Sequence, residues 1–294
     1  MSPALAFKHA LIRMGFDIKR LVRPKVAADA GAAPTVDPVW PLPVRPGMSP
    51  DTISEIFHRY PDWHYSYAFE GGLHFPPRPA KPAEDPHRQR PHQRFRHFMP
   101  EVIAHFGGSL KGIRVLDIAC NTGYWSVQCA LQGAEVTAFD ARPELVAQTT
   151  ALADIVGAKI AVRQLDFFEM TPDAFDGPFD LVLNLGLLYH LPNALETLQR
   201  SLAMTRQLLV VDTVVSPWSD RLIRLQWEQA REIRDTAHTG IIALPTRSAV
   251  ELMLRHLGVE QYQELPLRRL PMPVDYRRGD RTTWIVNRGA EHQA

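Results

Sequence analysis

The segment 115–126 constrains the fold of this chain more than any other stretch. It reads Val-Leu-Asp-Ile-Ala-Cys-Asn-Thr-Gly-Tyr-Trp-Ser, the pattern of a buried strand that ends in a tight turn and opens a helix. Asp117 lies near the carboxyl end of the expected strand, and the small residues Ala119 and Gly123 let the backbone approach a ligand closely. Open α/β sheets bind ligands outside the carboxyl ends of their strands, so the turn predicts a binding site.

A second carboxylate indicates that the ligand carries a ribose. The expected strand 134–139 ends at Asp140, about 20 residues after Asp117, which is where a ribose diol is held in folds of this kind. A dinucleotide turn of the form G-x-G-x-x-G fits poorly because only Gly123 is present, and no Walker lysine follows. Taken alone, the segment also suits an ordinary strand–turn–helix of an α/β protein.

Four segments occur in the order of the motifs of class I S-adenosylmethionine-dependent methyltransferases, and the chain resembles that family over about residues 105–290. The family turn D-x-G-x-G-x-G reads Asp-Ile-Ala-Cys-Asn-Thr-Gly here, with Ala and Asn at the first two glycine positions. Asp166 and Phe167 are similar to the acidic and apolar pair that holds adenine, and 179–186 resembles the fourth motif. The resemblance implies S-adenosyl-L-methionine as the cofactor, with contacts from Asp117, Ala119, Cys120, Asn121, Gly123, Asp140, Ala141, Asp166, Phe167, Asn184 and Gly186.

The order of the expected elements predicts an α/β fold. We expect a Rossmann-like class I methyltransferase sheet, mainly parallel, with an antiparallel C-terminal edge strand at 281–288 and an N-terminal extension. Residues 217–240 are expected to form a helical excursion over the site. Three units are predicted: a basic helix with a Pro/Ala-rich linker at 1–50, an aromatic and basic cap region at 51–108, and the methyltransferase domain at 109–290.

The cap region contains two separate signals. Residues 51–60 are typical of a capped helix, and the aromatic run 60–69 ahead of Gly71-Gly72 indicates a β-hairpin. The basic run 87–97 opens another helix, either as a solvated helix start or as a patch for an anionic substrate such as a phosphate, a carboxylate or RNA. Its three histidines are spaced by five residues and fall on different helical faces, so we expect no metal site.

Composition narrows the class of protein. A chain of 294 residues with 45% hydrophobic residues and a net charge of +1 is typical of a globular protein and gives no global argument for a nucleic-acid partner. Two cysteines, Cys120 and Cys129, exclude a disulfide framework and favour a reducing, cytoplasmic setting. No apolar run reaches the roughly 18 residues of a membrane span. Residues 3–23 predict an amphipathic basic helix, which packs on a protein surface or touches an anionic membrane or nucleic acid.

The residues directly after the fourth expected strand include the candidate catalytic residues. Methyl transfer from a sulfonium is an in-line displacement, so the protein must align the reacting atoms and exclude water. His190 is the candidate base for a hydroxyl acceptor, since histidine titrates near neutral pH; the alternative is a histidine that only shapes the loop. Tyr189 is expected to orient substrate or donor, or to pack. Weaker candidates on the substrate side are His64, Tyr65, His74 and Trp227.

Two segments carry a closer resemblance. Gly-Leu-Leu-Tyr-His at 186–190 and Arg-Arg…Thr-x-Trp at 277–284 resemble the tRNA wobble-uridine carboxymethyltransferase group and its relatives. The upstream Arg-Lys-Gly-Pro-Phe motif of that group is absent here, and a carboxylated donor requires a cation. We therefore expect methyl transfer to a hydroxyl, or an amine, of a small metabolite or glycan. A tRNA wobble-uridine (carboxy)methyltransferase and a catalytically inactive SAM-binding homologue are the alternatives, and a homodimer stays open.

Overall fold

The structure is a computed structural model that describes residues 36–60, 62–76, 89–230, 235, 237, 240–268 and 270–289. The expected basic helix at 3–23, its linker up to residue 35, and His87 lie outside these residues. In the parts of the chain that the structure describes, no helix combines the length and the apolarity that a membrane span requires.

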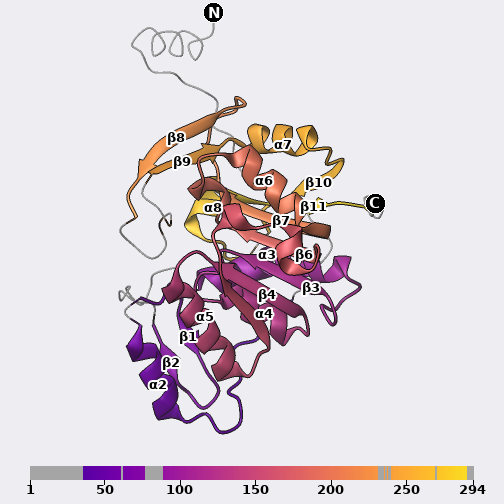
Figure 1. Cartoon of the computed structure of the whole chain (residues 1–294). Coiled ribbons are helices and arrows are strands. Elements are labelled where there is room, and N and C mark those ends of the chain that lie inside the picture. Colours follow the sequence, from indigo (N-terminus) through magenta and orange to yellow (C-terminus); the bar gives the residue numbers. More distant parts are fainter. Residues whose placement is uncertain are drawn as a thin grey trace, which may run out of the picture.

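A seven-stranded sheet forms the centre of the molecule (Figure 1). Its strands, in the spatial order β10-β11-β7-β6-β3-β4-β5, are Gln261–Glu264, Arg281–Asn287, Thr205–Val214, Phe179–Leu185, Arg114–Ile118, Glu135–Asp140 and Ile160–Gln164. The strands from β7 to β5 are parallel to one another, whereas β11 runs antiparallel to β7 and β10 antiparallel to β11. The predicted fold class is therefore confirmed. The predicted antiparallel strand is β11, and the short strand β10 lies outside it at the edge.

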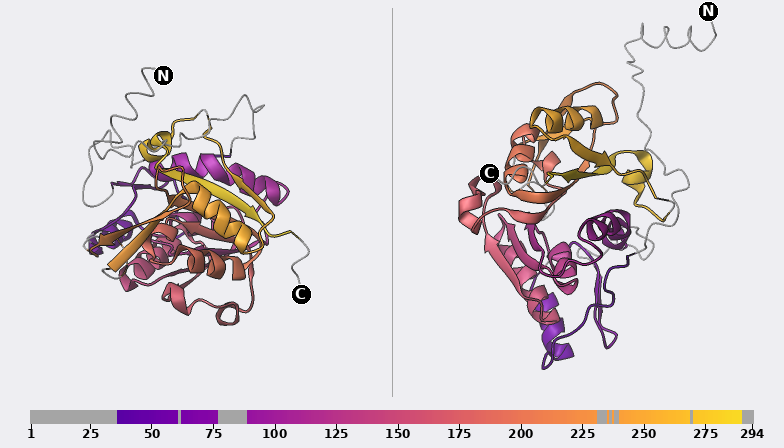
Figure 2. Two further views of the ribbon diagram at one scale, coloured as in Figure 1. Left: turned by 90° about the horizontal axis from the view of Figure 1, so that it is seen from above. Right: turned by 90° about the vertical axis from the view of Figure 1, so that its right-hand side faces the viewer.

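Helices cover both faces of this sheet. The strand residues Val115 and Leu116 are adjacent in sequence and belong to two different apolar clusters, because successive side chains of a strand point to opposite faces. Figure 2, seen from above, shows α3 and α7 on opposite sides of β11. One cluster contains residues of α3 (Arg90–His105), α4 (Tyr124–Leu131) and α5 (Pro143–Val156), and the other contains residues of α6 (Ala194–Ala203) and α7 (Arg247–His256).

The N-terminal part of the described chain packs onto the same core. Helix α2 (Pro50–Arg59) and the short hairpin of β1 (Tyr67–Ala68) and β2 (His74–Phe75) agree with the sequence prediction, and Gly71 and Gly72 turn the hairpin with positive φ. The rings of Phe57 and Trp63 stack with centroids 4.2 Å apart. These side chains belong to the apolar cluster that also contains Val115, so this segment and the sheet share one core.

The expected helical excursion at 217–240 is wrong. The described residues form an antiparallel two-stranded ribbon of β8 (Ile223–Glu228) and β9 (Gly240–Pro245). The physical reason is visible in the sequence, because Ile-Arg-Leu-Gln-Trp-Glu alternates apolar and polar residues with the period of two that favours a strand. Helix α7 follows β9 directly, and its N-cap Thr246 accepts a hydrogen bond from the backbone N–H of Ala249.

Tyr67 connects the N-terminal hairpin to the turn after β3. Its buried hydroxyl donates to the carbonyl oxygen of Thr122 at 3.0 Å and lies 2.8 Å from the Thr122 hydroxyl. We predict that Tyr67→Phe lowers the free energy of unfolding by about 1–3 kcal/mol, because it leaves a buried carbonyl unsatisfied. Chemical denaturation measures this loss. Tyr262→Phe, on the edge strand β10, is the matched control, and equal losses in the two variants would contradict the assignment.

Candidate active site

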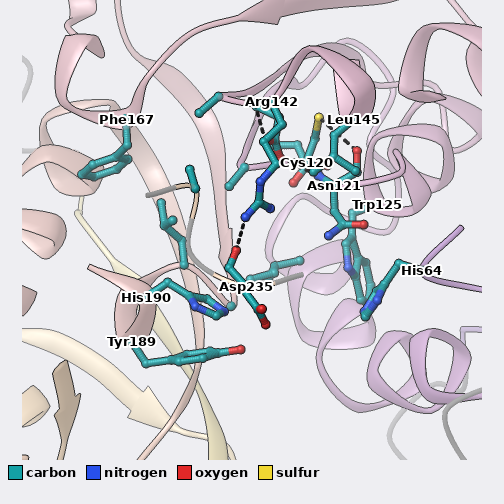
Figure 3. Close-up of a pocket in the computed structure, with 18 of the residues that line it drawn as sticks. His64, Cys120, Asn121, Trp125, Arg142, Leu145, Phe167, Tyr189, His190 and Asp235 are labelled. Carbon is teal, nitrogen blue, oxygen red and sulfur yellow. Dashed lines mark hydrogen bonds between the residues drawn. The ribbon is translucent and has the colours of Figure 1, made fainter. Parts of the chain in front are cut away.

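A cavity of about 430 Å³ opens at the carboxyl ends of β3, β4 and β6 (Figure 3). This is the edge of the sheet at which the sequence analysis placed the ligand. Of the predicted residues, those that line the cavity are Asp117, Ala119, Cys120, Asn121, Asp140, Ala141, Asp166, Phe167, Gly186, Tyr189 and His190. Gly123 and Asn184 do not line it.

The turn after β3 keeps a left-handed backbone without the usual glycines. Ala119 and Asn121 both have φ of 53°, a conformation that costs an L-residue of order 1–3 kcal/mol. Neighbouring groups hold it: the Asn121 side chain accepts from the backbone N–H of Thr122 at 2.8 Å, and the Asn121 carbonyl accepts from the Thr149 hydroxyl at 2.8 Å. The turn is therefore a strained element that its surroundings fix in place.

The two predicted contacts outside the cavity have structural roles. Gly123 is the N-cap of α4 with φ of 79°, and a Cβ there would lie 2.8 Å from Cγ2 of Thr149. Only glycine permits this approach of α4 to α5. Asn184 is fully buried, and its side-chain amide donates to the Ser201 hydroxyl of α6 at 3.1 Å. The side chain of Asn184 therefore points away from the cavity.

Asp140 ends β4 with its carboxylate partly hydrogen-bonded. One oxygen accepts from the backbone N–H of Asn121 and the other from that of Arg142, each at 3.1 Å. Burial raises the pKa of Asp140, while these N–H donors oppose the rise. Each oxygen keeps further acceptor capacity. A carboxylate held in this way suits a pair of ribose hydroxyls, so the residue fits the predicted cofactor.

Asp117 is buried at the end of β3 and accepts a hydrogen bond from the Ser126 hydroxyl at 2.6 Å. Burial raises the pKa of Asp117 to about 7. A cationic group bound beside this carboxylate would favour its ionised form. Asp117 therefore fits the ammonium end of the predicted cofactor.

Asp166 and Phe167 follow β5 at the far side of the cavity. Asp166 caps the 3₁₀ turn η2 (Phe167–Glu169), accepting from the backbone N–H of Phe168 at 2.9 Å. Figure 3 shows the Phe167 ring beside the cavity, across from His64. A ring and an acid next to one another fit the adenine that the resemblance implies.

Tyr189 and His190 lie on the 3₁₀ turn η4 (Leu188–His190), directly beyond β6. Nδ1 of His190 is 2.9 Å from Oε2 of Glu228, which is the last residue of β8. Burial lowers the pKa of His190, and the hydrogen bond that its ring donates to Glu228 opposes that shift. Burial raises the pKa of Tyr189, whose ring lies 5.5 Å from the guanidinium carbon of Arg281. Sequence analysis missed Glu228 because it expected a helix there.

A buried charge cluster forms the wall behind Tyr189. Asp212 on β7 accepts from Arg94 on α3 at 2.8 Å and from Arg281 on β11 at 2.7 Å, and from the hydroxyls of Thr283 and Tyr276. The two guanidinium groups hold the pKa of Asp212 well below its usual range, against the effect of burial. Sequence analysis did not identify this cluster. The one available signal was an aspartate inside the apolar run Leu-Leu-Val-Val-Asp.

The described part of the basic run, residues 89–97, contributes side chains both to the cavity and to the core. Arg90 and Arg94 line the cavity, and Arg90 donates to Asp275 of α8 (Val274–Arg278) at 2.7 Å. His97 is 1% exposed, so this part of α3 is not the solvated helix start that was one of the two interpretations. Within the described ranges, no group of three or more His, Cys, Asp or Glu residues lies as a metal site would need.

Of the four substrate-side candidates, two line the cavity and two lie outside it. His64 and Tyr65 line the cavity. His74 is exposed on β2 outside it, and Trp227 is 67% exposed on β8 and does not line it. Arg142, beside Asp140, donates to the carbonyl oxygen of Asp235, which also lines the cavity.

Comparison with known proteins identifies the class. The family model for the methyltransferase domain matches residues 89–264, which is more than half of the chain. The chain therefore belongs to the methyltransferase domain family. The N-terminal domain of EvdMO1, solved in the presence of SAH and D-fucose, shares the fold with a TM-score of 0.61 at 18% identity, over 82% of this chain and 96% of that one. Family and fold support S-adenosylmethionine as the cofactor.

Curated relatives match over shorter stretches. The ubiquinone biosynthesis O-methyltransferase of Maricaulis maris is 36% identical over 101 residues, which is 33% of this chain and 39% of that protein. The tRNA U34 carboxymethyltransferase of Idiomarina loihiensis is 28% identical over 155 residues, or 51% of this chain and 46% of that protein. The chain thus spans less than half the length of these two relatives.

The raised pKa of Asp117 predicts a pH dependence of cofactor binding. An ammonium group beside Asp117 lowers its pKa, so binding below about pH 7 releases a proton, and affinity rises with pH until it levels off above that value. The stability of the free protein depends on pH in the opposite direction. It falls as pH rises between 3.8 and about 7, because the folded state holds the additional proton. Calorimetry in buffers of different ionisation enthalpy measures the release. Asp117→Asn should abolish it, and unchanged release in that variant would assign it elsewhere.

Proposed function

We propose that this chain transfers a methyl group from S-adenosylmethionine to a hydroxyl, or an amine, of a small metabolite or glycan. The observation that carries the proposal is that the imidazole of His190 lines the same cavity as the acids Asp117 and Asp140. The family supports the transfer, and a relative named as an O-methyltransferase supports oxygen as the acceptor atom.

In this proposal each side chain has one task. Asp140 binds the ribose, Asp117 holds the ammonium, and Phe167 with Asp166 holds the adenine. When bound, S-adenosylmethionine supplies a methyl group that is already activated on a sulfonium, so alignment is the main requirement. Nε2 of His190 takes the proton from the acceptor hydroxyl, a step that contributes roughly 10²–10⁴-fold. Tyr189 orients the acceptor beside it.

Asp140→Ala tests the binding half of the proposal. The variant loses charge-assisted hydrogen bonds of about 1.5–3 kcal/mol each, so the affinity for S-adenosylmethionine and S-adenosylhomocysteine should fall at least tenfold. Calorimetry measures both affinities. Glu135→Ala, at the exposed start of the same strand, is the control. A folded Asp140→Ala protein with unchanged affinity would refute this binding mode.

His190→Ala tests the chemical half. Donor binding should stay close to that of the wild type, and turnover should fall by about 10²-fold or more, because the proton loses its acceptor. A transfer assay with tritiated methyl donor and a panel of hydroxylated metabolites, sugars and tRNA measures turnover and identifies the acceptor. His256→Ala, in the exposed last turn of α7, is the control. Near-normal turnover across the pH range would reduce His190 to a loop-shaping role.

The alternative is a tRNA wobble-uridine carboxymethyltransferase, which one relative's name supports. Its donor would bring an additional carboxylate into the cavity. Among the described residues, the cavity lining holds five carboxylates (Asp117, Asp140, Asp166, Asp235, Asp275) and four guanidinium groups (Arg90, Arg94, Arg142, Arg281), so positive charge is not in excess among them. An additional buried carboxylate without its own cation costs several kcal/mol. This balance favours the ordinary methyl sulfonium donor.

Competition binding decides between the two donors. We expect S-adenosylmethionine to bind at least as tightly as its carboxylated form to the purified protein, because Arg90, Arg94 and Arg281 already have carboxylate partners. Arg281→Lys is an informative variant, since it keeps the charge and loses the bond geometry of the guanidinium. Tenfold tighter binding of the carboxylated donor would favour the tRNA-modifying alternative.

A further inference from the structure

We propose that Glu228 is a positioning residue that holds His190 with its Nε2 atom toward the cavity. The inference rests on the proposed role of His190 as the base. Its direct evidence is the 2.9 Å contact between Nδ1 of His190 and Oε2 of Glu228. Both side chains are largely buried, at 14% and 23% exposure, so water competes little for this contact.

The contact determines which nitrogen carries the proton. A neutral imidazole has one N–H and one lone pair, and the partner of one nitrogen selects the tautomer. The Glu228 carboxylate accepts only, so it draws the proton to Nδ1 and leaves the lone pair on Nε2. Figure 3 shows the His190 ring directed into the cavity beside Tyr189. His190 is therefore prepared to accept a proton from a group bound there.

The ribbon of β8 and β9 brings Glu228 to this place. Glu228 pairs with Gly240 at the end of the ribbon, and its neighbour Trp227 is 67% exposed. Because successive strand residues point to opposite sides, an exposed Trp227 goes together with a Glu228 that faces the body of the protein. The turn η4 packs against β9, β7 and α6, so His190 is fixed from its own side.

Charged groups around His190 set the direction of its titration. The guanidinium groups of Arg281 and Arg142 and the burial of the ring lower the pKa of His190, whereas Glu228 raises it. Tyr189, on the same turn, has a ring centroid 4.0 Å from that of His190 and a raised pKa of its own. Removing the charge of Glu228 should therefore lower the pKa of His190 further.

Nuclear magnetic resonance of the ¹⁵N-labelled histidines tests the proposal without any acceptor, with His190→Ala used to assign the signal. In the wild type the neutral ring should carry its proton on Nδ1. In Glu228→Gln, which keeps the shape and loses the charge, the pKa of His190 should fall by about one unit or more. The variant Glu228→Asp should restore most of the shift. Glu55→Gln, on the exposed side of α2, should leave the titration unchanged.

The transfer assay supplies the second readout. Glu228→Gln should reduce kcat at least tenfold, move the acid limb of its pH profile downward with the His190 titration, and leave donor affinity and acceptor KM nearly unchanged. A proton on Nε2 in the wild type, or an unchanged His190 titration in Glu228→Gln, overturns the positioning role. If the wild type transfers no methyl group while the resonance results hold, the proposed function fails and the positioning contact stands.

Discussion

The carboxylate of Asp212 is the interaction on which the wall of the active site depends. It lies at 0% exposure and is bonded to Arg94, Arg281, Tyr276 and Thr283, so one buried anion joins α3, β7, α8 and β11. Removing one member of a buried charge cluster costs about 3–5 kcal/mol, because the others lose their partner. The cluster thereby connects α3, which precedes the sheet in the sequence, to β11, the last strand in the sequence. Each of the two elements contributes at least one arginine to the cavity.

The opposite wall depends on strain and on side-chain support. Ala119 and Asn121 keep left-handed backbones because Asp140, Thr149 and the Thr122 backbone hold the turn. Tyr67 braces the same turn from the N-terminal hairpin. Between these two walls, the ribbon of β8 and β9 adds Glu228 behind His190. The cavity is thus assembled from segments that are far apart in the sequence, each fixed by buried polar contacts.

Errors of the sequence interpretation have identifiable physical causes. The ribbon was expected as a helix, although its alternation of apolar and polar residues has the period of a strand. The donor contact expected of Asn184 is one through its backbone carbonyl and stays a prediction; its side chain bonds to Ser201 behind the sheet, because its position in the strand directs it to that face. The aspartate within the apolar strand β7 was a signal of a buried charge, but nothing in the sequence indicated its partners.

The sequence alone determined the α/β sheet, the turn after β3, the acid at the end of β4 and the turn that carries Tyr189 and His190. These are local features, since strand period, turn residues and short spacings within one strand–turn–helix unit encode them. Only the tertiary structure decided that Glu228 meets His190 and that Arg94 and Arg281 share Asp212. Those pairs are 38, 118 and 69 residues apart, and no sequence period records which side chains a folded sheet brings together.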